Sequence, residues 1–155
     1  RDTLVLATLI ALACYWLIPM APPRLIGDGF IDVMASYADF GWWGTHASAP
    51  PGTAPWTNEF AAFPSMHVGW AVWCGWMLTG ARTRPVRLLG FAYPVFVTFV
   101  VVATGNHFLL DAVAGAAAII VSAHIARVWH RDRLRTLRSL TVRADEVAIG
   151  ESGRS

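Results

Sequence analysis

The chain has 155 residues, 55% of them hydrophobic, and a mean hydropathy of +0.48, values that exclude an ordinary water-soluble domain of this length. Its formal net charge of +2 gives no sign of a nucleic-acid partner, and its two cysteines lack the spacing of a disulfide framework. The composition predicts an integral membrane protein.

Four long stretches without Arg, Lys or Glu follow one another along the chain: residues 3–23, 60–81, 88–106 and 108–126. Each is close to the roughly 20 residues that an α-helix needs to cross the hydrocarbon core of a bilayer. The buried helices of a soluble bundle would show a charged face, and these stretches show none. We therefore expect an all-α, polytopic membrane helix bundle with four spanning helices.

The first helix is expected over about residues 3–20, because the prolines that follow forbid its continuation. Arg24 comes directly after these prolines, where a lone arginine usually extends toward the membrane surface. Four residues of the polar stretch 25–59 have helical spacing and predict a short interfacial helix: Ile31, Met34, Ala35 and Ala38. Three tryptophans of the same stretch are expected at headgroup depth: Trp42, Trp43 and Trp56.

The second helix is expected to start at Pro64 and Ser65, since Pro is tolerated in a first helical turn and Ser can accept hydrogen bonds from free backbone amides. His67 then lies in the first turn. Gly75, with small neighbours four residues away on either side, predicts a face for close helix packing. A basic turn, residues 82–87, leads into the third helix, which we expect to end at Ala103.

His107 and Asp111 stand four residues apart at the start of the fourth apolar stretch, so in a helix they would share one face. An ionised Asp costs roughly 2.5 to 3.5 kcal/mol at mid-bilayer depth and less near the surface, which favours a partner or a task for Asp111. His107 is the expected partner, and Gly115 would permit a close helix approach beside the pair. Taken alone, the pair is better explained as a polar plug between helices, because structural pairs also perturb titration.

The distribution of arginines predicts the orientation. Residues 131–155 are expected to form a basic cytoplasmic tail, separate from a membrane catalytic domain over residues 1–130. If the helices alternate in direction, this tail and the basic turn lie on one side, which the arginine bias makes cytoplasmic. Arg24, the Ser65 start of the second helix and the His107 start of the fourth then meet on the outer face.

Two histidines, a carboxylate, a serine and an arginine near two helix N-termini predict a phosphate site. Ser65 offers a hydroxyl group and Arg24 a planar guanidinium group for phosphate oxygens. His107, held through one ring nitrogen by Asp111, could attack phosphorus through the other. His67, when protonated, could give its proton to the leaving oxygen, a role worth about 10²- to 10⁴-fold in rate. Water or an acceptor hydroxyl would then take the phosphoryl group.

These residues resemble the type 2 phosphatidic acid phosphatase superfamily of membrane lipid phosphatases and phosphotransferases. Pro-Ser-Met-His at residues 64–67 matches its Pro-Ser-x-His motif, and His-Phe-Leu-Leu-Asp at residues 107–111 matches its His-x-x-x-Asp motif. The resemblance implies that His107 is the nucleophile, Asp111 its orienting carboxylate, His67 the general acid and Ser65 a phosphate ligand. It also implies a lipid phosphate substrate, no metal and no other cofactor.

The chain departs from the lipid-phosphatase pattern at two places. Leu17 stands where a Lys would precede Arg24, and Val100 and Val101 stand where a Ser-Arg pair would precede the second histidine. The sequence is more similar to the branch of inositol phosphorylceramide synthases and their bacterial, particularly actinobacterial, relatives. The six helices usual in the family, together with the missing initiator Met, suggest a fragment whose first two helices lie ahead of Arg1.

Other interpretations remain open from the residues. His67, His107, Asp111 and His46 could bind zinc in a membrane hydrolase. Alternatively, the His and Asp side chains could relay protons or hold helices together in a non-enzymatic transporter or scaffold. His46 could border the site, whereas His124 and His130 fall toward the cytoplasmic end. Self-association into a homo-oligomer is also left open.

Overall fold

The computed structural model describes residues 1–27, 29–37, 39, 58 and 60–152. These residues form helices only, apart from an isolated bridge between Met20 and Ala61. The elements in chain order are α1 (Asp2–Leu17), the 3-10 helix η1 (Pro23–Leu25), α2 (Val33–Ser36), α3 (Met66–Thr79), α4 (Arg84–Ala103) and α5 (Leu109–Ser152). The predicted all-α class is therefore confirmed for this part of the chain.

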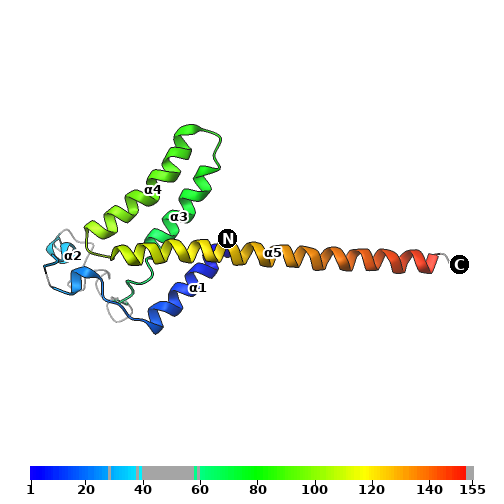
Figure 1. Cartoon of the computed structure of the whole chain (residues 1–155), viewed down its shortest axis with the longest axis horizontal. Helices are drawn as coiled ribbons and strands as arrows, with labels where there is room; N and C mark the ends of the chain where they lie inside the picture. The colour runs from blue at the N-terminus through cyan, green and yellow to red at the C-terminus, as the bar shows by residue number, and fades with distance from the viewer. Residues whose placement is uncertain (28, 38, 40–57, 59, 153–155) are drawn as a thin grey trace.

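Helices α3 and α5 hold the bundle together, because each packs mainly against two other helices (Figure 1). Helices α1 and α3 both contact the first half of α5, and α4 pairs with α3 as an antiparallel hairpin. η1, α2 and the N-terminus of α5 gather at the left-hand end in this view, where α4 ends. The second half of α5 extends alone to the right as far as the C-terminus, beyond the other helices.

Several predicted helix boundaries are confirmed. Ser65 is the N-cap of α3, and its side-chain oxygen accepts a hydrogen bond from the backbone N–H of Val68. Helix α4 ends at Ala103. The fourth helix differs, because α5 starts only at Leu109 and continues without a break through residue 126 to Ser152.

Within the part of the chain that the structure describes, two helices, not the four predicted, are long and apolar enough to cross a membrane: α4 and the Leu109–Thr141 part of α5. Helix α1 has 16 residues and α3 has 14. At 1.5 Å per residue these helices are about 24 and 21 Å long, shorter than a hydrocarbon core of about 30 Å. The apolar stretches are longer than the helices because residues near Pro19 and Pro64 leave the helical conformation.

The buried core is small and divides around α3. Met66 packs with two alanines of α1 and with Ile119 of α5, while Val68 packs with Val101 of α4 and Ala112 of α5. Glycine permits the α3–α4 contact, since a Cβ atom at Gly90 would lie 2.7 Å from the carbonyl oxygen of Gly75. The close-packing face predicted around Gly75 is thus confirmed, with α4 as the partner.

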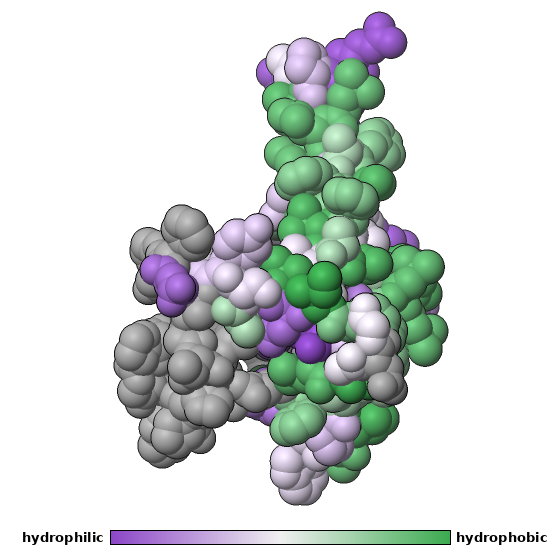
Figure 2. All heavy atoms as spheres, turned by 90° about the vertical axis from the view of Figure 1, so that its left-hand side faces the viewer, coloured by the Kyte–Doolittle hydropathy of each residue, from purple (hydrophilic) through white to green (hydrophobic). Residues whose placement is uncertain are grey.

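Large apolar side chains cover the outside of the bundle. On α4 six of them are at least 60% exposed: Leu88, Leu89, Phe91, Val95, Phe96 and Phe99. Figure 2 shows the shaft of the α3–α4 hairpin in green and its far tip, which carries the basic turn, in purple. An apolar outer surface of this extent, ending in charge, favours a hydrocarbon environment around the hairpin.

The predicted interfacial helix is present but short. Helix α2 has four residues, and Asp32 caps it by accepting a hydrogen bond from the backbone N–H of Ala35. The remaining expectations for the polar connection concern residues outside the described part of the chain: Ala38, Trp42, Trp43, His46 and Trp56.

Candidate active site

Three segments far apart in the sequence meet at one end of the bundle. Ser65 donates its backbone N–H to the carbonyl oxygen of Asp111 (2.9 Å), which joins the start of α3 to the first turn of α5. Arg24 of η1 donates its backbone N–H to the carbonyl oxygen of Gly105 (2.9 Å), in the turn between α4 and α5. Figure 2 views the molecule from this end and shows hydrophilic residues gathered at its centre among apolar ones.

His107 lies in this turn, two residues before α5, and only 5% of its surface is exposed. Its Nδ1 atom is 2.8 Å from the carbonyl oxygen of Ala62 and 3.6 Å from Oδ2 of Asp111. Both partners are acceptors, so Nδ1 carries the proton and Nε2 keeps its lone pair. The ring is therefore held in the tautomer that a histidine nucleophile requires.

His67 faces the free nitrogen of His107. The distance from Nδ1 of His67 to Nε2 of His107 is 3.3 Å, and the ring centroids are 5.5 Å apart. Because Nε2 can only accept, the proton between the rings belongs to His67. His67 is exposed while His107 is buried, so a ligand that reaches the pair meets His67 first.

Burial lowers the pKa of His107 below its ordinary value, and the proximity of His67 lowers it further. The Ala62 carbonyl and the Asp111 carboxylate act in the opposite direction, but they are the weaker influences. His107 is consequently neutral at neutral pH, with its Nε2 lone pair available.

Asp111 has two partners at the start of α5. Besides its contact with Nδ1 of His107, its Oδ2 atom accepts a hydrogen bond from the backbone N–H of Phe108 (2.8 Å). A carboxylate three residues into a helix that binds the capping residue in this way stabilises the helix start. The side chain is 1% exposed, so these contacts replace its hydration.

Ser65 is completely buried, and the sequence prediction that it binds phosphate therefore needs qualification. Its hydroxyl oxygen caps α3, as described above. The approach of α3 and α5 is so close here that a Cβ atom at Gly115 would collide with the carbonyl oxygen of Ser65. The predicted role of Gly115 in close helix packing is confirmed, and the helix that it accommodates is α3.

Arg24 is buried, in contrast to the usual exposed arginine at a helix end. Its Nε atom donates to Oδ1 of Asn106 (3.0 Å), and its Nη1 atom forms an ion pair with Oδ2 of Asp32 (3.3 Å). These contacts attach the guanidinium group to the residue before His107 and to the cap of α2. Sequence reasoning missed both Asn106 and Asp32, since neither belongs to a motif and only the fold brings them to Arg24.

A cavity of about 280 Å³ opens beside the two histidines. Its lining combines His67 and His107 with side chains of α1, of α3 and of the segment before α3, mostly apolar: Thr8, Ala11, Leu12, Tyr15, Ala61, Met66 and Trp70. The hydroxyl group of Tyr15 donates to the carbonyl oxygen of Pro64 (2.8 Å) and so ties α1 to the loop before Ser65. Tyr15 was not among the residues predicted for the site.

No group of three His, Cys, Asp or Glu side chains within the described ranges is arranged to hold a metal ion. Asp111 and His67 contact opposite nitrogens of the His107 ring. One ion therefore cannot bind the carboxylate and both rings in this arrangement.

The fold and the site define a class: an all-helical protein with two facing histidines, one of them backed by a carboxylate, beside an apolar cavity. A family model described as the PAP2 superfamily matches residues 1–125, about four fifths of the chain, and the chain belongs to that superfamily. No curated protein and no solved structure matches the chain. Membership supports a phosphatase-type enzyme that acts on a phosphate ester.

Proposed function

We propose that the protein is a membrane lipid phosphatase or phosphotransferase that cleaves the phosphate ester of a phospholipid or a polyprenyl phosphate through a phosphohistidine intermediate. The observation that carries the proposal is the fixed tautomer of His107, whose Nδ1–H is held by Ala62 and Asp111 while Nε2 faces His67. Family membership supports the reaction class, and this arrangement supports the residue roles.

In the first step Nε2 of His107 attacks phosphorus, and the bond from phosphorus to the ester oxygen breaks. His67, when protonated on both ring nitrogens, gives one proton to the leaving oxygen and becomes neutral, so the lipid leaves as an alcohol. In the second step water or an alcohol attacks the phosphohistidine, and His67 takes the proton released. Phosphate or a new phosphate ester leaves, and both histidines return to their starting states.

The remaining site residues would hold the reacting groups in place. Asp111 stabilises the positive charge that develops on His107 as the new bond forms. Arg24 supplies the guanidinium group nearest to the turn of His107, and a phosphate anion would compete with Asp32 for it. Ser65 would contact phosphate only through its hydroxyl hydrogen, because its oxygen already caps α3.

The proposal of a lipid substrate rests on the surroundings of the histidines. The cavity beside them is lined mostly by apolar side chains of α1 and α3, suited to a hydrocarbon chain attached to the phosphate. The exposed apolar surface of α4 and the two helices of spanning length support a membrane location. The basic turn at the other end of the α3–α4 hairpin supports an extracytoplasmic site in a bacterial plasma membrane.

The geometry disfavours the two alternative functions. A zinc site at these residues would need His107 to release either Asp111 or His67, as the two contact different ring nitrogens. A scaffold role would explain why Asp111 is buried, but it gives no reason for an exposed His67 beside a cavity. Similarity to the inositol phosphorylceramide synthase branch favours transfer to an alcohol over hydrolysis, and a homo-oligomer stays compatible with either reaction.

The test is covalent labelling of the detergent-purified protein with a ³²P-labelled aryl phosphate, whose good leaving group needs no general acid. Wild type should acquire label that is stable in base and lost in acid, in the presence of EDTA. His107→Ala should acquire none, while His67→Ala should still be labelled although it no longer turns over a lipid phosphate. His124→Ala, an exposed histidine of α5 distant from the cavity, is the matched control and should behave as wild type.

Label that persists in His107→Ala would contradict the assigned nucleophile. Turnover abolished by EDTA and restored by zinc would instead favour the metal hydrolase. Product analysis with a long-chain alcohol present decides between hydrolysis and transfer, because only transfer produces a new phosphate ester.

A further inference from the structure

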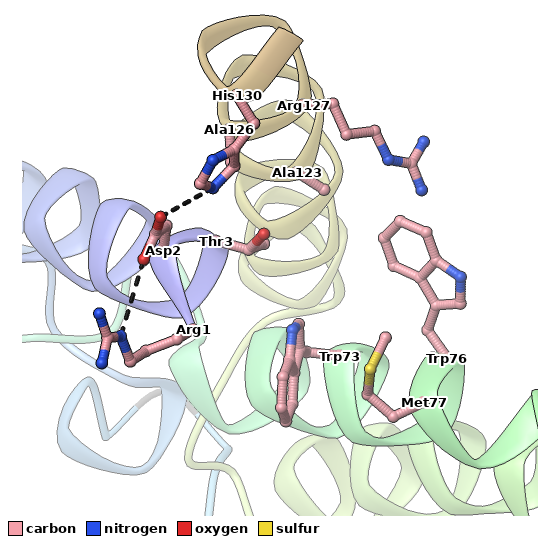
Figure 3. Close-up of a pocket in the computed structure, with 10 residues that line it drawn as sticks. All are labelled: Arg1, Asp2, Thr3, Trp73, Trp76, Met77, Ala123, Ala126, Arg127 and His130. Atoms are coloured by element: carbon pink, nitrogen blue, oxygen red, sulfur yellow. Dashed lines mark ion pairs between the residues drawn. The ribbon is translucent and has the colours of Figure 1, made fainter. Parts of the chain in front are cut away.

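A second cavity, of about 390 Å³, lies at the other end of the same three helices. The start of α1, the end of α3 and the middle of α5 enclose it (Figure 3). It shares no lining residue with the cavity beside the catalytic histidines. The proposed reaction therefore gives this cavity no role.

The side chains that line the cavity carry a net positive charge. Its ionisable lining residues are Arg1, Asp2, Arg127 and His130, two arginines and a histidine against a single carboxylate. Asp2 is already engaged, since Oδ2 lies 2.9 Å from Nε2 of His130 and Oδ1 lies 3.8 Å from Nε of Arg1. The charge left over is positive, so the cavity attracts an anion.

Aromatic and sulfur-containing side chains of α3 form the opposite wall. The guanidinium carbon of Arg127 lies 4.7 Å from the centre of the Trp76 ring, and Figure 3 shows Trp73 and Met77 beside them. Stacking on Trp76 restricts the Arg127 side chain and leaves the edge of its guanidinium group for an anion. The cavity thus offers cations on its rim and apolar surface next to them, which suits an amphipathic anion.

The position of the cavity along α5 indicates where this anion comes from. Arg127 lies 18 residues beyond Leu109, about 27 Å along a straight helix. That distance is close to the hydrocarbon thickness of a bilayer. If the end of the bundle with the two site histidines lies at one headgroup layer, this cavity therefore lies at the other. The arginines of the turn 82–87 and of α5 after residue 130 flank it on the same end of the bundle.

We propose that this cavity binds the phosphate group of an anionic phospholipid from the leaflet opposite to the catalytic site. Arg127 contacts the phosphate, Arg1 and His130 remain beside Asp2, and the acyl chains lie against the apolar surface of α3 and α5. The lipid acts there as a bound ligand and not as a substrate, because the two catalytic histidines lie at the other end of the helices.

The test is titration of the detergent-purified chain with short-chain phosphatidylglycerol, phosphatidylcholine and inorganic phosphate. Phosphatidylglycerol should bind most tightly. Each basic residue near an anionic lipid contributes roughly a fivefold change in affinity, so Arg127→Gln should weaken phosphatidylglycerol binding about fivefold. Arg133→Gln, which removes the same charge from an exposed α5 position outside the cavity, should change it less than twofold.

Two further variants control for effects of charge elsewhere in the cavity lining and for lipid binding at the histidine site. Arg1→Gln removes an arginine that is paired with Asp2 and extends away from Arg127 in Figure 3, so it should weaken binding less than Arg127→Gln does. His107→Ala should bind phosphatidylglycerol as wild type does, which separates this cavity from the catalytic site. Equal losses in Arg127→Gln and Arg133→Gln, or equal affinity for phosphatidylcholine or inorganic phosphate, would overturn the proposal.

Discussion

The two ends of the helix bundle treat polar side chains in opposite ways. At the end with the candidate active site, Arg24, Ser65, His107 and Asp111 are each at most 5% exposed, and each has a partner from a distant segment. At the other end the polar groups are open to their surroundings, since Arg127 is exposed and the side chain of His130 is 60% exposed. Burial at the first end fixes the orientation of the polar side chains, whereas exposure at the second end lets the positively charged side chains attract an anion.

Burial of so many polar atoms is unfavourable unless each atom is hydrogen-bonded. At the end with the candidate active site, backbone carbonyl oxygens accept many of these hydrogen bonds: Ala62 accepts from His107, Gly105 from Arg24, and Asp111 from Ser65. The network makes the site rigid, and it also means that small changes have large effects there. Equivalent substitutions at the exposed end should change activity and stability much less. Three experiments test this difference between the two ends.

The largest effect is expected for Asp111→Asn. The amide keeps the shape of the carboxylate, but it no longer stabilises the positive charge on His107 as Nε2 forms a bond to phosphorus. We expect kcat to fall by about 10²- to 10³-fold, in the range lost when a group that stabilises transition-state charge is removed. Asp132→Asn removes the same charge from a side chain that is 64% exposed, and its kcat should match wild type. Similar rates in both variants would contradict the orienting role of Asp111.

Gly115→Ala is the second test, and it addresses packing alone. Alanine normally favours a helix over glycine by about 1 kcal/mol, but here the Cβ atom would collide with the Ser65 carbonyl oxygen. We expect a net loss of about 1–3 kcal/mol in the free energy of unfolding, measured by thermal unfolding in detergent.

Gly80→Ala is the matched control, since Gly80 caps α3 at the exposed end with an ordinary φ of −77°. A Cβ atom there would be 3.4 Å from the nearest atom, the carbonyl oxygen of Met77. Its unfolding temperature should stay close to that of wild type. Equal destabilisation by the two alanines would show that the approach of α3 and α5 is less constrained than the structure indicates.

Local sequence patterns predicted much of the framework of the site. The cap at Ser65, the first-turn position of His67, the end of α4 at Ala103 and the close approach at Gly115 all follow from helix-start and small-residue rules. Such features depend on residues within one or two helical turns. The spacing of His107 and Asp111 also predicted their contact, although His107 precedes the helix and does not lie within it.

What the sequence could not supply are contacts made by the backbone and by residues outside motifs. The acceptor for Nδ1 of His107 is a carbonyl oxygen 45 residues away, and every residue type has a carbonyl. Asp32 and Asn106 reach Arg24 only because η1 folds onto the turn before α5. The number of helices of spanning length was overestimated because hydropathy marks apolar stretches and does not reveal how much of each leaves the helical conformation near a proline.

The smallest expected effect concerns pH, and it tests the electrostatics of the buried end directly. Burial and His67 together lower the pKa of His107, so the neutral form persists in the folded protein at pH values where an ordinary imidazole, with a pKa of about 6.5, gains a proton. The folded state then binds fewer protons than the unfolded state, and stability should fall as pH drops below about 6.5 toward the lowered pKa. The activity that depends on the Nε2 lone pair should change by less than about twofold between pH 7.5 and 6.5, and it should fall only as the pH drops through the lowered pKa of His107.

The direct measurement is NMR titration of the ring ¹³Cε1 signal of His107, identified by its disappearance in His107→Ala. In Asp111→Asn the midpoint should move to still lower pH, because the carboxylate is one of the groups that hold the pKa of His107 up. A midpoint above 6.5 in wild type, or a shift to higher pH in Asp111→Asn, would contradict a ring that is kept neutral by burial. In that case His107 would be protonated at neutral pH, and the nucleophile would have to be generated by proton transfer from Nε2 before each turnover.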